Sequence, residues 1–395
     1  MISYDETLQL TFASAKRTSP ETLSLREALG RVLAEDLVTP FPLPRFDNSA
    51  VDGYALTEPM GDSVWKAVRT IGAGESPGEP LQPGECARIF TGAPTPPGTY
   101  AVVMQEDTAL KDGTIQVCEE PKPRQNIRRA GEEFSLGAVV LPAGLPLNAA
   151  GVAAAATLGR TNVSVYRAPR VGIMVTGAEL VSPGKELAEG QIYESNSYAL
   201  SAALLSLGLN PEFVEVIGDD LDLTLATLRT ALQRCEVLIT TGGVSVGDRD
   251  VVRGALENLG VQEVYWKVGI KPGKPVYLGT HGDKAIFGLP GNPLSVLATF
   301  TLLVQPFLKA SMGFSNPVPR RLKAKLATAI RHKPGRREFI PANLDGMKVS
   351  PILGQGSHML GGMARADALI DVPADALEIS AEEEVWVIPF GQGSS

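Results

Sequence analysis

The stretch VLITTGGVSVGDRD, residues 237–250, places an apolar run directly before a glycine pair and then continues into a helical pattern. A second stretch, AIFGLPGNPLS at residues 285–295, repeats this arrangement. A strand, a tight glycine turn and a helix N-terminus gather free backbone N–H groups around one point, and this geometry binds phosphate and other anions. Two such loops predict a ligand with more than one anionic group.

Apolar runs and helical patterns alternate around these two loops. We expect strands at 170–176, 212–217, 237–241, 264–268 and 284–287, and helices at 197–207, 221–234, 248–259 and 293–312. This alternation predicts an α/β domain with a doubly wound, mostly parallel sheet. Ligands of such sheets bind beyond the carboxyl ends of the strands, where both glycine loops lie.

The rest of the 395-residue chain predicts three further domains beside the α/β domain of residues 169–316. The first is a discontinuous N-terminal α+β domain, residues 1–45 and 131–168. We expect its helices at 3–17, at 24–36, where Ser24 and Glu27 would form a capping box, and at 149–158. Short β-like runs between Gly/Pro turns predict a small β-rich insertion, residues 46–130. Residues 317–395 again show short β runs, at 322–330, 338–343 and 384–389, and predict a C-terminal β-barrel-like or sandwich domain.

Composition and charge exclude several function classes. The net charge of −8 argues against nucleic acid as a partner. The N-terminus lacks a secretory signal, and the apolar stretch 294–304 is too short to span a bilayer, so we expect a cytoplasmic protein without a membrane partner. Three scattered cysteines and three scattered histidines argue against disulfides, a zinc site and a Ser-His-acid triad. Any metal is expected to be a hard cation such as Mg²⁺.

Candidate binding residues lie in three loops that follow strands. Gly242 and Gly243 permit close backbone approach, Ser245 offers a hydroxyl, and Gly291 and Asn292 lie in the second glycine loop. Lys271 and Lys274 sit in the proline-stiffened turn KPGKP, which suits a tetrahedral oxyanion but alone also fits a solvated basic turn. Because a single glycine turn is most often only a turn, the convergence of several loops carries this prediction.

Acidic residues recur where the expected strands end. Glu179, Asp219 and Asp250 could surround a Mg²⁺ that bridges phosphate oxygens. The alternative for Asp219 is an N-cap of the helix that begins near residue 221. In the β-rich insertion, Asp52 followed by glycine also fits an ordinary tight turn, and residues 126–133 fit a surface salt-bridge cluster.

Taken together, the motifs resemble the molybdopterin molybdenumtransferase family, which includes bacterial MoeA and the E domains of gephyrin and its plant homologues. The matching stretches run through the chain in the family's order: DNSAVDGYA (47–55), IFTGAP (89–94), NIRRAGEEF (126–134), TGAEL (176–180), the acidic turn 218–220, TTGGVSVGDRD (240–250), KPGKP (271–275), GLPGNPLS (288–295) and GQGSHMLGGMARADAL (354–369). The ordered set is far more specific than any one motif.

The resemblance implies an enzyme that inserts molybdenum from molybdate into adenylylated molybdopterin, assisted by Mg²⁺, with release of AMP. It implies a homodimer of four-domain subunits whose site lies between domain III of one subunit and domain II of the other. Molybdopterin adenylyltransferase and molybdoenzyme maturation factors are the other implied partners. Two alternatives stay open: the chain is itself a molybdopterin adenylyltransferase, or it is a non-catalytic cofactor-binding scaffold. The extra terminal domains argue against the first, and the carboxylates at 52, 219 and 250 argue against the second.

The resemblance also assigns site residues by motif. Asp52 and Thr91 face the site from the partner subunit, and Glu133 holds an acidic position of the same domain. Glu179, Asp219 and Asp250 handle metal and pyrophosphate. The residues implied to bind phosphate or molybdate are Lys267, Lys271, Lys274 and Ser295, with Arg337 and Ser357 reaching in from the C-terminal domain. The chain departs from the family at Pro341, where many members have a basic residue, and at Arg249, a position that is often aromatic or small.

Overall fold

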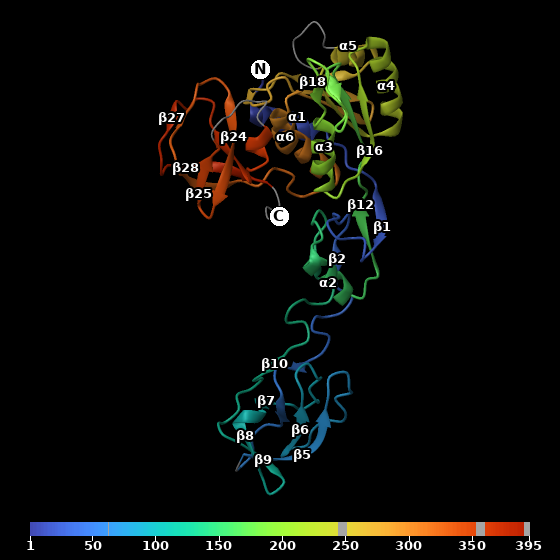
Figure 1. The fold of residues 1–395 in the computed structure, drawn as a ribbon. Helices are drawn as coiled ribbons and strands as arrows, with labels where there is room; N and C mark the ends of the chain where they lie inside the picture. Colours follow the sequence, from blue (N-terminus) through green and yellow to red (C-terminus); the bar gives the residue numbers. More distant parts are fainter. Residues whose placement is uncertain (62, 244–250, 353–359, 391–395) are drawn as a thin grey trace. The chain divides into compact units, whose positions relative to one another are not determined.

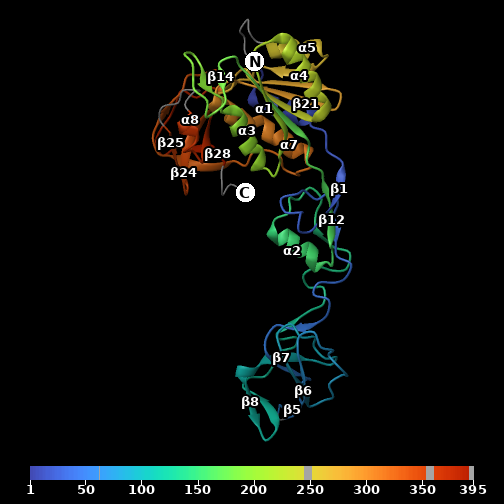
Figure 2. The same ribbon diagram turned by 45° about the vertical axis from the view of Figure 1, so that its right-hand side comes forward.

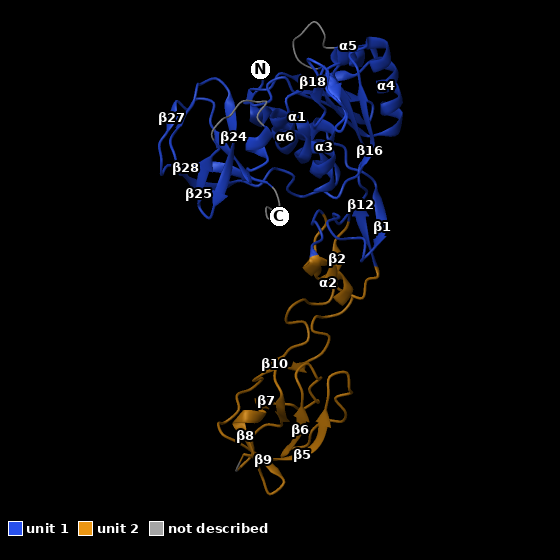
Figure 3. Ribbon diagram, viewed as in Figure 1, with its two compact units in different colours: residues 1–34, 144–148, 162–395 blue, residues 35–143, 149–161 orange. Residues whose placement is uncertain are grey.

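The computed structural model describes residues 1–61, 63–243, 251–352 and 360–390 (Figure 1). The chain divides into two compact units (Figure 3). Unit 1 comprises residues 1–34, 144–148 and 162–395, and unit 2 comprises residues 35–143 and 149–161. The four predicted domain boundaries stay a prediction, and each unit is described by itself below.

Unit 1 contains a six-stranded sheet of order β16-β13-β17-β21-β20-β18. Its first four strands are parallel: β16 (Pro211–Ile217), β13 (Val171–Thr176), β17 (Val237–Thr241) and β21 (Lys284–Leu289). β20 (Tyr277–His281) runs antiparallel to β21, and β18 (Gln262–Trp266) runs antiparallel to β20. The predicted mostly parallel sheet is confirmed, with β20 as an additional strand.

The two faces of this sheet carry different helices because successive side chains of a strand point to opposite sides. Ile173 and Val175 of β13 belong to a core shared with α3 (Asn196–Leu205), α7 (Gln305–Ser311) and α1 (Tyr4–Ser14). Met174 belongs instead to a core shared with α4 (Leu221–Arg234) and α5 (Val251–Asn258). Figure 2 shows α3 and α7 on one side of the sheet and α4 and α5 on the other.

The apolar stretch that follows the second glycine loop is a buried helical run. It consists of α6 (Pro293–Thr299), the π-helical segment η2 (Phe300–Val304) and α7. The run of 19 residues is long and apolar enough to cross a membrane, but 72% of its most apolar window is buried inside the structure. Its burial gives it the character of a core helix, although the run is longer than the apolar stretch 294–304 that the sequence analysis judged too short to span a bilayer.

The C-terminal part of unit 1 is a closed barrel. The ring is formed by β24 (Arg337–Asp345), β25 (Lys348–Pro351), β22 (Leu322–Leu326), β28 (Glu384–Pro389) and β26 (Ala368–Val372), which returns to β24. Ile340 and Ile370 fill its interior, whereas Phe339 and Leu369 join the core of the α/β sheet. The barrel is thus packed against the sheet by the alternate residues of its own strands.

The predicted helix at 24–36 is wrong. Residues 20–24 form the strand β1 (Pro20–Ser24), which pairs with β12 (Asn162–Tyr166). Ser24 and Glu27 do bond, with Ser24 Oγ donating to the Glu27 carboxylate at 2.6 Å, but they close a turn. The backbone N–H of Leu33 donates to Leu145 O at 3.1 Å, and Gly30 takes a positive φ of 77°. Long-range backbone pairing therefore overrides the local helical pattern.

Unit 2 contains a second six-stranded sheet of order β7-β4-β6-β5-β9-β8. Its strands are β4 (Gly53–Leu56), β5 (Val64–Ile71), β6 (Glu85–Ile89), β7 (Ala101–Met104), β8 (Thr108–Lys111) and β9 (Thr114–Val117). Ala55 and Leu56 belong to separate apolar clusters, so each face of the sheet carries buried apolar side chains. The predicted β-rich character of this region is confirmed.

Short elements complete both units. Unit 2 also holds β2 (Leu37–Val38), β3 (Asn48–Ser49), η1 (Gln105–Asp107), β10 (Ile127–Arg128), β11 (Val139–Leu141) and α2 (Ala149–Thr157). Unit 1 also holds β14 (Leu180–Val181), β15 (Ile192–Tyr193), β19 (Ile270–Lys271), β23 (Ile330–Arg331), α8 (Leu360–Met363) and β27 (Glu378–Ile379).

Candidate functional site

The loops singled out in the sequence begin at one edge of the parallel sheet. Thr176 of β13 is in register with Ile217 of β16, and Thr241 of β17 is in register with Leu289 of β21. Because parallel strands leave the sheet on the same side, the loops that start at residues 177, 218, 242 and 290 share this edge. This is the place where open α/β sheets bind ligands.

Backbone crowding fixes the first glycine loop. Gly242 has a φ of 82°, and a Cβ added to it would stand 2.3 Å from the carbonyl oxygen of Thr176. The nearest atom to a Cβ at Gly291 would be Gly242 Cα, at 4.0 Å, so the two glycine loops are neighbours. Only glycine satisfies both the positive φ and the close approach at residue 242.

Asn196 ties the two glycine loops together. Its Nδ2 donates to Gly291 O at 2.8 Å and to Thr241 Oγ1 at 3.4 Å. Asn196 lies at the start of α3 and is 7% exposed. Sequence reasoning missed this residue because a single asparagine inside a helical pattern gives no signal.

A cavity of about 300 Å³ lies beside the second glycine loop, whose Pro290 and Asn292 line it. Its charged and polar lining is contributed by Lys271, Lys274, Asn292, Ser295, Arg336 and Glu338, and Gly273, Pro290, Phe339 and Pro341 complete much of the wall. A Cβ at Gly273 would stand 2.2 Å from Thr299 Cγ2, and its φ is 101°. The turn between Lys271 and Lys274 can therefore pack this closely against α6 only with glycine at residue 273.

One cavity lysine is bound to a carboxylate. β19 pairs in parallel with β24, and Lys271 is in register with Glu338. Lys271 Nζ lies 2.7 Å from Glu338 Oε1, and His332 Nε2 lies 3.5 Å from Glu338 Oε2. The side chain of Glu338 is 9% exposed and that of His332 is 2% exposed, so this chain of contacts runs from the cavity wall into the protein.

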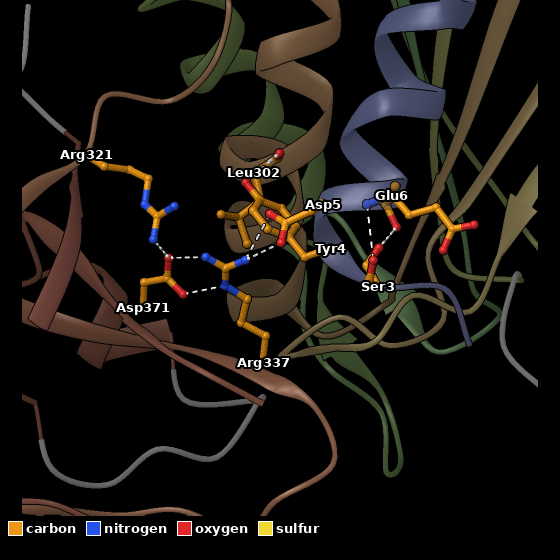
Figure 4. Close-up of polar contacts among 9 residues, drawn as sticks. Ser3, Tyr4, Asp5, Glu6, Leu302, Arg321, Arg337 and Asp371 are labelled. Atoms are coloured by element: carbon orange, nitrogen blue, oxygen red, sulfur yellow. Dashed lines mark hydrogen bonds and ion pairs between the residues drawn. The ribbon is translucent and has the colours of Figure 1, made fainter. Parts of the chain in front are cut away.

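Arg337 is the first residue of β24 and Arg336 directly precedes it, but the two side chains have different surroundings. Arg336 lines the cavity, with its Nη1 donating to Ile270 O at 3.4 Å. Arg337 instead binds both carboxylate oxygens of Asp371, at 2.6 and 2.8 Å, and reaches Asp5 at 3.0 Å (Figure 4). The guanidinium of Arg337 is thus engaged in holding α1 to the barrel, and the substrate contact predicted for it stays a prediction. Arg336, which the sequence analysis did not select, is the guanidinium that lines the cavity.

Lys267 does not belong to the cavity lining either. Its ammonium lies 3.7 Å from the ring centroid of Trp266, on which Arg253 also packs at 3.8 Å. Both distances are typical of cation–π contacts. The predicted phosphate contact of Lys267 stays a prediction.

Two of the predicted metal ligands lie in adjacent loops. Asp219 Oδ2 accepts a hydrogen bond from the backbone N–H of Ala178 at 3.3 Å, next to Glu179. The helix cap considered for Asp219 is made by its neighbour, because Asp220 Oδ1 accepts from Leu223 N at 2.7 Å. Asp219 and Glu179 are both exposed and offer the hard oxygen ligands that Mg²⁺ prefers. Among the described residues no group of three or more possible ligands occurs, and the predicted residues Ser245, Asp250 and Ser357 lie outside the described residues.

Unit 2 brings Asp52 and Thr91 together. Asp52 Oδ1 accepts from both the hydroxyl and the backbone N–H of Thr91, each at 2.7 Å. These bonds, the hydroxyl's first, lower the pKa of Asp52 below its usual value. Glu133 is exposed, and its backbone N–H donates to Leu43 O at 3.0 Å.

Comparisons with known proteins decide the family. Family models match residues 2–159 as the MoeA N-terminal region (domains I and II), 172–310 as a probable molybdopterin binding domain and 323–390 as the MoeA C-terminal region (domain IV). The molybdopterin molybdenumtransferase of Haemophilus influenzae is 38% identical over 384 residues, which cover 94% of each chain. The chain belongs to the molybdopterin molybdenumtransferase family.

The similarity to molybdopterin molybdenumtransferases covers nearly the whole chain and includes its fold. Molybdopterin molybdenumtransferase 2 of Mycobacterium tuberculosis is 35% identical and covers 98% of this chain and 99% of its own. A crystal structure of the MoeA protein of Pyrococcus horikoshii superposes with a TM-score of 0.87 at 32% identity, covering 99% of this chain and all of that one. The protein is therefore an enzyme of this family with a role in molybdenum cofactor biosynthesis.

The departure noted at residue 341 falls within the cavity wall. Pro341 is one of the lining residues, so the basic side chain that the family resemblance leads us to expect there is replaced by proline in this wall. The positive charge of the described lining comes from Lys271, Lys274 and Arg336. Glu338 brings a negative charge to the same cavity, and the sequence analysis missed it because an acidic residue in a strand is usually solvated.

Proposed function

We propose that the protein inserts molybdenum from molybdate into adenylylated molybdopterin, with Mg²⁺ and with release of AMP. The observation that carries this proposal is the cavity in which two lysines, one arginine and the hydroxyl of Ser295 face a common space. Molybdate is a tetrahedral dianion, and ammonium, guanidinium and hydroxyl groups are the donors that hold such oxyanions. The cavity adjoins the second glycine loop, which neighbours the first, and the two loops suit the phosphates of the adenylylated pterin.

In this reaction the protein would position molybdate and the phosphoanhydride and neutralise their negative charge. Lys271, Lys274 and Arg336 would hold the molybdate oxygens, while the backbone N–H groups of the glycine loops would hold the phosphoanhydride. The pterin dithiolene provides the sulfur ligands of molybdenum. Burial raises the pKa of Cys86 to about 12 and that of Cys235 to about 11, so these thiols stay protonated and do not compete for the metal.

Mg²⁺ would be held by Glu179 and Asp219, with Asp250 as a third ligand by family resemblance. When bound, the cation neutralises negative charge on the phosphate oxygens. The two described carboxylates lie at the sheet edge that also holds the glycine loops, which supports this assignment.

The remaining parts of the proposal rest on the motif resemblance. The enzyme would act as a homodimer in which Asp52 and Thr91 of one subunit complete the site of the other, with Glu133 at an acidic position nearby. It would work in the cytoplasm and exchange substrate and product with a molybdopterin adenylyltransferase and with molybdoenzyme maturation factors.

Reconstitution from defined substrates tests the function. Purified protein, adenylylated molybdopterin, Mg²⁺ and molybdate should yield AMP together with a cofactor that activates an apo-molybdoenzyme, and a chelator should stop the reaction. Lys274→Ala should lower the rate roughly 100-fold because it removes one oxyanion donor. Lys323→Ala is the matched control, since Lys323 is exposed and pairs with Glu384 on the barrel. Formation of adenylylated molybdopterin from ATP without molybdenum insertion would contradict the proposal and indicate an adenylyltransferase.

A further inference from the structure

The anion cavity contains a carboxylate that the proposed reaction does not use. Glu338 lines the cavity together with three cationic side chains, although a carboxylate repels an oxyanion. Its side chain is 9% exposed, so water screens it poorly. A charge in this position changes what the cavity can bind.

Both oxygens of Glu338 are already engaged. Oε1 is 2.7 Å from Lys271 Nζ, and Oε2 faces His332 Nε2 at 3.5 Å. His332 Nδ1 lies 3.0 Å from the carbonyl oxygen of Ala376, which can only accept, so Nδ1 carries a proton. Both ring nitrogens of His332 thus face oxygen acceptors, and the imidazolium is the form of the ring in which both nitrogens donate. In that form the His332–Glu338 pair has no net charge.

We propose that His332 cancels the charge of Glu338 and thereby makes the cavity selective for fully deprotonated tetrahedral dianions. The inference rests on the proposed function, since it concerns the same oxyanion site. A bare carboxylate in an anion site favours a ligand that brings its own O–H, such as hydrogen phosphate, and rejects one that has only acceptors. Molybdate and sulfate carry no proton at neutral pH, whereas phosphate does. With His332 in place, Glu338 holds Lys271 in the wall without excluding molybdate.

A double-mutant cycle tests this assignment in the full-length protein. Molybdate, sulfate and phosphate are titrated separately by calorimetry at low salt and pH 7.5 against wild type, His332→Gln, Glu338→Gln and the double variant. His332→Gln keeps a hydrogen-bond donor but cannot carry the charge. It should weaken molybdate and sulfate binding about tenfold and phosphate binding clearly less, as expected for one added charge at partial screening.

The double variant separates charge from structure. Glu338→Gln should bind molybdate at least as tightly as wild type, and His332→Gln should then have no further effect, because the charge it compensates is gone. A merely structural role of His332 would weaken binding by the same factor in both backgrounds. His281→Gln, at the exposed end of β20, and Glu384→Gln, on the barrel surface, are the matched controls and should change nothing.

The outcomes distinguish this inference from the proposed function. If molybdate binds wild type but His332→Gln leaves the order of the three anions unchanged, or weakens binding equally in the Glu338→Gln background, the selectivity role is overturned and the insertase proposal stands. If Glu338→Gln weakens molybdate binding about tenfold, Glu338 is itself needed by the ligand and the inference is also overturned. If wild type binds none of the three anions, the cavity is no oxyanion site and both proposals fall.

Discussion

At the scale of single residues, hydrogen bonds from one neighbour lower the pKa of Asp52. The Thr91 hydroxyl and backbone N–H both donate to the same carboxylate oxygen, at 2.7 Å each, and this lowers the pKa of Asp52 although its side chain is exposed. A carboxylate that already accepts two hydrogen bonds stays ionised and presents its second oxygen to a ligand.

Thr91→Val should raise the pKa of Asp52 towards its ordinary value, because the variant keeps the shape and loses the hydroxyl bond. NMR titration of the Asp52 carboxyl carbon measures this directly. Since the folded-state pKa is lowered, the stability that this bond contributes is present above the unfolded-state pKa and is lost as the pH falls through the folded one. Thr99→Val, whose hydroxyl donates to a backbone carbonyl, should leave the Asp52 titration unchanged. An unshifted Asp52 in Thr91→Val would show that the hydroxyl is not the cause.

Single residues also show what could not be predicted from the sequence, namely which of two adjacent side chains lies in the site region. Arg336 and Arg337 are adjacent, as are Asp219 and Asp220, and each pair has one member in the site region and one in a structural contact. Motif matching selects the neighbourhood, but the side chains of two adjacent residues can point in different directions. Which member faces the ligand depends on a register that only the folded barrel and helix fix.

At the scale of elements, a buried ion cluster attaches α1 to the barrel. Asp371 of β26 has a side chain that is 1% exposed and binds both Arg337 and Arg321, each with a contact of 2.6 Å. Arg337 extends the cluster to Asp5 and packs 5.0 Å from the ring centroid of Tyr4 on α1. Removing the central acceptor would leave two cations without their common partner.

Asp371→Ala should therefore destabilise unit 1 by about 3 kcal/mol. Thermal unfolding of the full chain, with hydrogen exchange in β24 and β26 to assign the transition, measures the loss. Asp5→Ala is the control within the same cluster: its side chain is 75% exposed, so about 1 kcal/mol or less is expected. Equal effects of the two substitutions would contradict the view that Asp371 is the centre of the cluster.

The elements that the sequence predicts correctly are those with a clear apolar run or a clear helical period between turn residues. β17, β28 and α4 coincide with the predicted ranges, since each is bounded by turn residues and buried along one face or both. β20 was missed because the run before it contains prolines and the strand itself contains Gly279, which weakens the β signal. The prediction of a helix at 24–36 was wrong because backbone N–H groups of this segment donate to carbonyl groups more than one hundred positions away.

At the scale of the whole molecule, the predicted site residues divide between two units with separate cores. Asp52, Thr91 and Glu133 lie in unit 2, whereas the cavity and the glycine loops lie in unit 1. A hydrophobic pattern identifies each core but contains no information on which copy of unit 2 serves a given cavity. The proposal that a second subunit supplies Asp52 therefore needs an experiment that tests the copies separately.

Mixing two inactive subunits provides that experiment. Asp52→Asn and Lys274→Ala should each abolish most insertion activity in their own homodimers. A heterodimer of the two, isolated through different tags on the two chains, should recover about half the wild-type rate, because one of its two sites combines an intact Asp52 with an intact Lys274. Homodimers of each variant carried through the same purification serve as controls. If the isolated heterodimer stays inactive, both residues act within one subunit. A fully active protein that light scattering shows to be a monomer would exclude a site shared between subunits.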